Sequence, residues 1–209
     1  MPAAFGASEP SIVSTIVPFA VLIVTVRVSP SGRGGGASVG QEVAPAEGAA
    51  VGATTPPLLA TGTLGEAQIA AAGKLLEELG REGVCRVVMI HHPPLTTESR
   101  FKRLTDAAAF QAMIRRVGCE IVLHGHNHRS EVARIAGPQG AIPVVGVTSA
   151  SAAPESKYGR ARYHLIGIER GTAGWRITLD IRALKADRTG CEPDGRIVFN
   201  GGAPAALAA

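Results

Sequence analysis

Five of the six histidines fall into two short clusters, and these are the residues best suited to chemistry. His91 and His92 lie in the sequence IHHPP, and His124, His126 and His128 lie in LHGHNH. A neutral imidazole is the commonest protein ligand for Zn, Fe, Mn and Co ions. A lone histidine is more often an ordinary polar loop residue, but five in two clusters favour metal or phosphate chemistry.

The residues around the second cluster allow its side chains to converge. His126 and His128 are one residue apart, and alternate side chains of an extended segment share a face. Gly125 permits a turn without a Cβ clash. After the first cluster, Pro93 and Pro94 stiffen the loop and remove two backbone donors.

Two apolar strands and a helix must position these clusters. Residues 86–90 (RVVMI) predict a strand that ends at His91, and residues 120–123 (EIVL) predict one that ends at His124. Between them, a helix capped by Thr105 or Asp106 is expected to run to about Arg116. Such uniformly apolar strands indicate a βαβ unit in a parallel sheet, where ligands collect at the carboxyl ends of the strands.

Further elements are predicted on either side of this unit. The sequence TLGE at residues 63–66 has the pattern of a capping box and opens an amphipathic helix that Gly80 or Gly83 would stop. Residues 142–148, 161–168 and 174–184 predict β-strands, the last two joined as a hairpin. A short strand over residues 196–199 and a frayed tail complete the chain.

The first 50 residues differ in composition from the rest of the chain. Residues 12–26 are nearly all apolar but too few for a comfortable membrane span, which needs about 20 residues. Three interpretations stay open: a membrane anchor or signal, strands packed on the domain, or a segment without a structural role that derives from an altered reading frame or start site. Residues 29–58 are rich in Gly, Ala, Pro and Ser, which is typical of a linker.

The overall composition suits a folded domain with an anionic ligand. The chain has 209 residues, is 45% hydrophobic and carries a formal charge of +4, with its basic residues scattered. No nucleic-acid partner is expected, because aromatic residues are only 4% and no basic block is present. The three cysteines, without Cys-x-x-Cys spacing, predict reduced thiols in a cytoplasmic protein, with Cys85 and Cys119 as small core residues.

The two histidine clusters, in this order and spacing, resemble the last two metal motifs of the calcineurin-like metallophosphoesterases, His-x-Pro and Gly-His-x-His. Residues 87–94 (VVMIHHPP) and 122–128 (VLHGHNH) carry the resemblance. Residues 55–65, 101–106 and 142–147 are similar to the same family, so that the likeness covers about residues 50–185. The bacterial phosphodiesterase branch of the family is the most similar.

This resemblance implies an α/β fold, the αββα sandwich of the family, and hydrolysis of a small phosphate ester, with phosphodiesters foremost. It implies a centre of two divalent ions, chosen from Mn, Fe, Zn and Co, that activate water. By motif position His91 and His126 would bind one metal ion and His128 the other. His92 and His124 would act in catalysis, by orienting the ligands or contacting the phosphoryl group.

The sequence departs from the family before His91. The family's first half supplies Asp-x-His, Gly-Asp and Gly-Asn-His motifs, and the first 90 residues here contain no Asp, Asn or His. We therefore expect an N-terminally incomplete sandwich: a divergent segment at 1–50, a partial domain at 51–190, and a strand and tail at 191–209. The activity is expected to be impaired. The alternative is an inactive remnant that binds a single metal ion, phosphate or a protein partner; the oligomeric state is not predicted.

Overall fold

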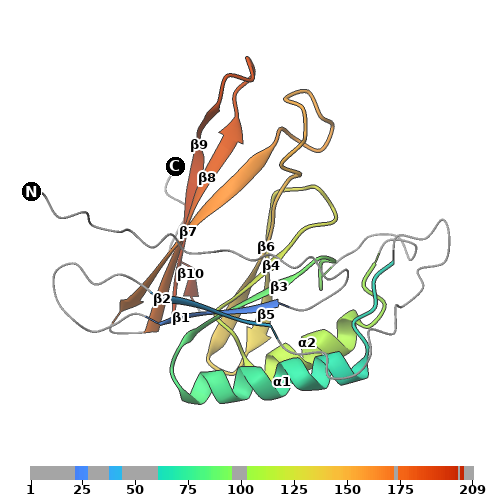
Figure 1. Cartoon of the computed structure of the whole chain (residues 1–209), viewed down its shortest axis with the longest axis vertical. Coiled ribbons are helices and arrows are strands. Elements are labelled where there is room, and N and C mark those ends of the chain that lie inside the picture. Colours follow the sequence, from blue (N-terminus) through green and yellow to red (C-terminus); the bar gives the residue numbers. More distant parts are fainter. Residues whose placement is uncertain are drawn as a thin grey trace, which may run out of the picture.

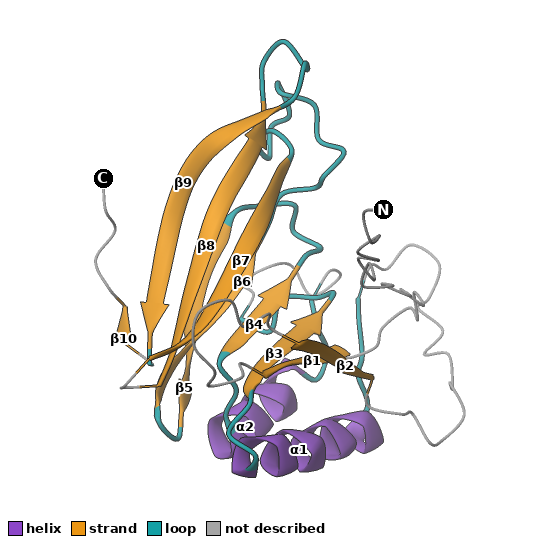
Figure 2. Cartoon of the chain, turned by 60° about the vertical axis from the view of Figure 1, so that its left-hand side comes forward, coloured by secondary structure: helices purple, strands orange, loops and turns teal. Residues whose placement is uncertain are grey.

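Two β-sheets stack face to face, and two helices cover the outer face of one of them (Figure 1). The computed structural model describes residues 22–27, 38–43, 61–95, 103–171, 174–201 and 203–204. Seen from the side, the long strands of the second sheet rise well above the first sheet, and the helices lie below it (Figure 2). The chain is therefore a mixed α/β protein.

The first sheet has six strands in the order β2-β1-β3-β4-β6-β5. Its central strands β3, β4 and β6 are parallel, and β1, β2 and β5 extend it with antiparallel pairs. The predicted parallel βαβ unit is confirmed, since β3, α2 and β4 follow one another along the chain. The bounds are Leu22–Arg27 (β1), Ser38–Val43 (β2), Cys85–Ile90 (β3), Ile121–His124 (β4), Glu131–Gly137 (β5) and Gly140–Gly146 (β6).

Both predicted helices form; Asp106 is the N-cap residue of α2, one of the two predicted, whereas Gly65 and not Thr63 is the N-cap residue of α1. Helix α1 spans Glu66–Arg81 and α2 spans Ala107–Val117, and neither has a side-chain cap. The capping-box prediction is wrong: the Thr63 hydroxyl hydrogen bonds to the Thr105 hydroxyl and not to the backbone of the first turn of α1. The Asp106 carboxylate instead accepts hydrogen bonds from the backbone N–H groups of Leu64 and Gly65. One carboxylate therefore joins the start of α2 to the start of α1.

Two apolar cores hold the three layers together. Between the helices and the first sheet, Leu76, Phe110 and Ile114 are fully buried against Val88 and Val122. Each such side chain contributes about 1.5–3 kcal/mol by its removal from water. Between the two sheets lies a second cluster that includes Cys85, Val87, Ile121, Leu179 and Phe199.

The prediction that two cysteines fill the core is confirmed. Cys85 and Cys119 are buried, and Cys191 is exposed. Burial raises the pKa of the Cys85 thiol to about 12 and raises that of Cys119 as well. Both thiols are therefore protonated and unreactive in the folded chain.

The second sheet is antiparallel, with the order β10-β9-β8-β7. The predicted hairpin of the two long strands is confirmed, and β9 is longer than the short strand expected at residues 196–199. The bounds are Arg162–Gly171 (β7), Gly174–Leu184 (β8), Cys191–Asn200 (β9) and Ala203–Pro204 (β10).

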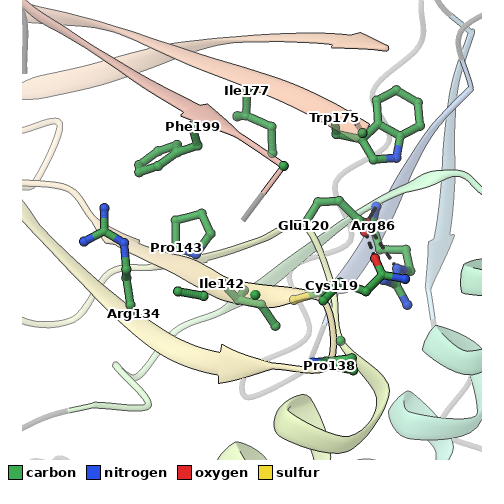
Figure 3. Close-up of a pocket in the computed structure, with 16 residues that line it drawn as sticks. Arg86, Cys119, Glu120, Arg134, Pro138, Ile142, Pro143, Trp175, Ile177 and Phe199 are labelled. Carbon is green, nitrogen blue, oxygen red and sulfur yellow. Dashed lines mark hydrogen bonds and ion pairs between the residues drawn. The ribbon is translucent and has the colours of Figure 1, made fainter. Parts of the chain in front are cut away.

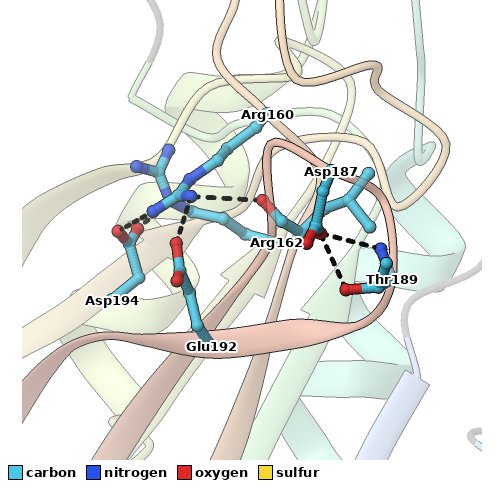
Figure 4. A network of polar contacts seen from close by, with 7 residues as sticks. Arg160, Arg162, Asp187, Thr189, Glu192 and Asp194 are labelled. Carbon is cyan, nitrogen blue, oxygen red and sulfur yellow. Dashed lines mark hydrogen bonds and ion pairs between the residues drawn. The ribbon is translucent and has the colours of Figure 1, made fainter.

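A polar network ties the loop before β7 to strand β9 (Figure 4). Arg160 donates to Glu192 at 2.5 Å and to Asp194 at 2.8 Å, and Arg162 donates to Asp194 at 2.5 Å. Asp194 therefore lies between two guanidinium groups at the upper end of the second sheet.

The first sheet extends into the first 50 residues, for which three interpretations were open. Residues 22–27 form β1, which pairs antiparallel with β3, and this favours strands packed on the domain. Residues 38–43 form β2, so the linker prediction is wrong for that stretch. Residues 12–21 lie outside the part of the chain that the structure describes. Neither described helix is long and apolar enough to cross a bilayer.

The layers differ from the expected four. Within the described residues, both helices lie on the first sheet, and the outer face of the second sheet carries no helix. Strand β5 was not predicted, because its sequence EVARIAG lacks a continuous apolar run. The division at residues 50 and 190 stays a prediction.

Candidate metal centre

The two histidine clusters lie at the same edge of the first sheet. In the parallel register of β3 and β4, Ile90 is opposite His124, so both strands end at the same level. His91 and His92 follow β3 directly, and His126 lies in the loop after β4. The predicted meeting of the clusters at the carboxyl ends of two parallel strands is confirmed.

Three of the histidines converge on one point. The ligand nitrogens of His91, His92 and His126 all lie within 4.8 Å of one another. His126 Nδ1 is 3.2 Å from His91 Nε2, and the rings of His92 and His126 are 4.0 Å apart at their centroids. We call these three residues the histidine triad.

The backbone of the second cluster turns sharply to bring His126 into the triad. The Gly125 N–H donates to the His91 carbonyl at 3.1 Å, which ties the ends of β3 and β4 together. Asn127 N–H then donates to the Gly125 carbonyl at 2.8 Å. His126 has a φ of 64° and His128 one of 53°, a left-handed backbone that non-glycine residues rarely adopt. Such strain concentrates at functional sites.

His92 is the buried member of the triad, with 4% of its surface exposed. Gly62 lies directly behind it: a Cβ at this glycine would lie 2.3 Å from His92 Nδ1. Gly62 is held there by the segment before α2, because the Thr105 N–H donates to its carbonyl at 2.8 Å. This role of Gly62 was not predicted, because its only sign in the sequence is the glycine itself within residues 55–65.

The environment of the triad favours the neutral imidazole that metal ions bind. Burial lowers the pKa of His91, and the neighbouring charge of His128 lowers it further. A lowered pKa leaves the His91 ring unprotonated at neutral pH, with a nitrogen lone pair available.

His124 lies apart from the triad, on the helix side of the sheet. It is 7% exposed, and its Nδ1 lies 3.2 Å from the Gly125 carbonyl. Its Nε2 is 3.5 Å from Glu131, which also accepts a hydrogen bond from Asn127. Burial lowers the pKa of His124, and the Gly125 carbonyl and Glu131 oppose this shift in part. His124 thus anchors the loop that carries His126, and its predicted catalytic role stays a prediction.

His128 is exposed and lies beside Tyr158, with the two ring centroids 6.5 Å apart in an edge-on arrangement. The structure therefore groups His92 with His91 and His126, where the sequence named His128 as the third ligand. The ligand role of His128 remains a prediction.

The donor set of the triad fits one metal ion. Three neutral imidazoles with an open fourth position form a known zinc site, in which adjacent nitrogens are about 3.3 Å apart. The His91–His126 separation of 3.2 Å matches that spacing, although a hydrogen bond between the rings explains it equally well. Among the described residues this is the one group of three or more such side chains close enough to hold an ion, and it contains no carboxylate. The described residues therefore do not fit the two-metal centre that the resemblance implied.

A cavity lies at the opposite end of the parallel strands, far from the triad. It has a volume of about 340 Å³ and opens between the β5–β6 turn and the second sheet (Figure 3). Trp175, Ile177 and Phe199 line one side, and the buried Arg86–Glu120 pair lies at one end. Nothing in its lining resembles the chemistry of the histidine clusters.

Comparisons with known proteins do not assign the chain to a family. No family model and no curated protein matches the sequence. Two crystal structures of Vps29 from Entamoeba histolytica, a single and a double mutant, are similar in structure, each with a TM-score of 0.36. Their sequence identities are 19% and 18%, and each match covers 55% of this chain and 56% of the Vps29 chain. The chain thus spans little more than half of these structures.

Proposed function

We propose that this chain is a phosphoesterase-type domain that binds one divalent metal ion through the histidine triad, with zinc as the preferred ion. The convergence of three imidazoles within 4.8 Å at the carboxyl ends of β3 and β4 carries the proposal. The motif resemblance of both clusters to the metallophosphoesterases adds the reaction class, hydrolysis of a phosphate ester and foremost of a phosphodiester.

In this proposal His91, His92 and His126 hold the ion, which when bound lowers the pKa of water and polarises a phosphoryl oxygen. The chain's own residues fix the geometry: Gly62 backs His92, and the Gly125 bond to His91 fixes the loop of His126. In the same proposal His128, exposed and two residues beyond His126, contacts the phosphoryl group or completes the ligand set.

A second candidate function is a metal-binding module without turnover. It is favoured by the absence of a carboxylate from the triad within the described residues. A carboxylate bridge neutralises charge and holds two ions close together, and a single ion held by three neutral ligands lacks both effects.

Metal analysis of the purified chain tests the site. We expect one equivalent of zinc per chain, and we expect zinc at 100 times its dissociation constant to raise the free energy of unfolding by about 2.7 kcal/mol. His91→Ala, His92→Ala and His126→Ala should each abolish this gain, and His164→Gln, which changes the histidine outside both clusters, should retain it. An unchanged metal content in all three alanine variants would sink the proposal.

The same preparations decide between the sequence-predicted and the structural ligand set. If His128→Ala loses the metal and His92→Ala does not, the motif assignment is right and the triad is not the site. Hydrolysis of bis(p-nitrophenyl) phosphate with added Zn or Mn, absent in His126→Ala, would establish the enzyme. A chain that binds one equivalent of zinc and shows no such hydrolysis is the non-catalytic module.

A further inference from the structure

A patch of positive charge lies next to the triad and has no role in the proposed metal site. It consists of Arg129, Lys157 and Tyr158, and we call it the cationic patch. Lys157 Nζ lies 4.9 Å and Arg129 Cζ 5.6 Å from the centroid of the Tyr158 ring. Both separations are within the range of a cation–π interaction, so two positive charges are held around one exposed phenol.

The patch is linked to the triad through His128, which follows His126 by two residues and precedes Arg129 directly. The His128 ring lies edge-on to Tyr158, with the two ring centroids 6.5 Å apart. Arg129 is three residues beyond His126, and three residues span at most about 11 Å of chain. A phosphate ester bound at the triad can therefore reach the cationic patch with a group that lies a few bonds from its phosphorus.

The cations of the patch have no carboxylate partner among the described residues. No ion pair involves Arg129 or Lys157 in the part of the chain that the structure describes, whereas Arg160, Arg162, Arg188 and Arg196 each pair with a carboxylate. The attraction of each cation to the ring is worth about 0.5–1 kcal/mol at an exposed site. This attraction explains why the two cations lie beside the ring, and it adds no negative charge to the patch.

We propose that Arg129, Lys157 and Tyr158 form a second anion-binding subsite beside the triad, and that its ligand is a phosphate ester with a second phosphate group. The inference rests on the proposed function for the position of the first phosphate. The second phosphate carries a charge of about −1.5 to −2 and three acceptor oxygens, which match two cations and a phenol hydroxyl. A phosphate ester with a neutral organic group would leave the patch unused.

Two probes that differ by one phosphate test this subsite. Propyl phosphate and propane-1,3-diyl bisphosphate are titrated calorimetrically into zinc-loaded protein and into metal-free protein. We expect the bisphosphate to bind at least tenfold more tightly than propyl phosphate to the zinc-loaded chain. In Arg129→Gln/Lys157→Gln this advantage should fall below about twofold, while propyl phosphate binds as before. The charge-conserving Arg129→Lys/Lys157→Arg should retain most of it.

A matched control removes the same charge elsewhere. Lys74→Gln/Arg115→Gln changes two exposed cations of α1 and α2, and it should bind both probes as the natural chain does. Equal affinity of the natural chain for the two probes would refute the subsite. It would also be refuted if the control lost as much of the bisphosphate advantage as Arg129→Gln/Lys157→Gln does. If zinc does not bind, the metal-free titration still decides: a bisphosphate preference that depends on Arg129 and Lys157 keeps the subsite and rejects only the metal site.

Discussion

At the scale of single residues, the candidate centre depends on two close approaches of backbone to histidine. A Cβ at Gly62 would overlap His92, and a Cβ at Gly146 would lie 2.7 Å from His124 Cε1. The histidines themselves could be recognised in the sequence by type and spacing. The glycines that give them room could not, because each contacts a residue 22 or more positions away, and glycine is in any case common in linker-like segments.

Gly62→Ala tests the first of these approaches. The added methyl group must displace the His92 ring, and changes to residues that orient metal ligands typically cost 10- to 100-fold in affinity. We therefore expect zinc to bind at least tenfold more weakly, as measured by competition with a chromophoric chelator. Gly167→Ala on β7 is the matched control, since its Cβ would have no contact closer than 3.8 Å. Equal zinc affinity in the two variants would show that Gly62 does not set the position of His92.

At the scale of elements, one buried ion pair fixes β3 against its neighbours. Arg86, 6% exposed, donates to Glu120 through Nε at 3.1 Å and through its terminal nitrogen at 2.9 Å. The same guanidinium donates to the carbonyls of Leu76 in α1 and Val117 in α2. The strand that ends at the triad is thereby joined to both helices.

Arg86→Met should destabilise the chain strongly. Removal of one partner leaves Glu120 largely buried without its counter-charge, which costs about 3–5 kcal/mol. The double replacement Arg86→Met/Glu120→Leu should recover most of this loss, because it removes the unpaired charge. Urea denaturation measures both. Arg196→Met, which breaks an exposed pair with Asp180, should change the free energy of unfolding by less than about 1 kcal/mol.

The elements that the sequence predicted well are those with one dominant pattern. The strands β3 and β4 have continuous apolar runs, and α1 and α2 have clear amphipathic stripes. The strands β2 and β5 were missed because pairing with a neighbour, rather than their own composition, makes them strands. The capping box at residues 63–66 was misassigned for a similar reason: the backbone there bonds to the carboxylate of Asp106, more than 40 residues away.

At the scale of the whole molecule, the three layers are stabilised by two cores that meet at the first sheet. Alternate residues of β3 face opposite layers, with Val88 toward the helices and Val87 toward the second sheet. The second sheet rises beyond the first, and at its upper end the polar network of Arg160, Arg162 and Asp194 lies beside the buried Ala161 and Ala183.

This network predicts a loss of stability in acid. Burial alone raises the pKa of Asp194, but hydrogen bonds from Arg162 and Arg160 outweigh it, and the net pKa is lowered. A carboxyl with a lowered folded pKa stabilises the chain above its unfolded pKa of about 3.9, and this contribution disappears as pH falls through the folded value.

Asp194→Asn should therefore be destabilising at pH 7, and its difference in unfolding free energy from the natural chain should shrink as the pH falls below about 3.9, as measured by denaturation across pH. Glu155→Gln, which breaks an exposed pair with Arg188, is the charge-matched control and should show a smaller difference at pH 7. If the difference in unfolding free energy between Asp194→Asn and the natural chain stayed constant from pH 7 to pH 2.5, the pKa of Asp194 would not be lowered by folding.

The position of the whole triad on one strand–helix–strand unit has a consequence for protein design. All three triad residues belong to one strand–helix–strand unit, between residues 85 and 128, and the contacts from outside it include Gly62 behind His92 and Gly146 and Glu131 at His124. Parallel strands in other α/β proteins have the same spacing of about 4.8 Å. A scaffold that is to receive the IHHPP and LHGHNH segments therefore needs two adjacent parallel strands, a glycine that faces His92, and a glycine and a carboxylate that face His124.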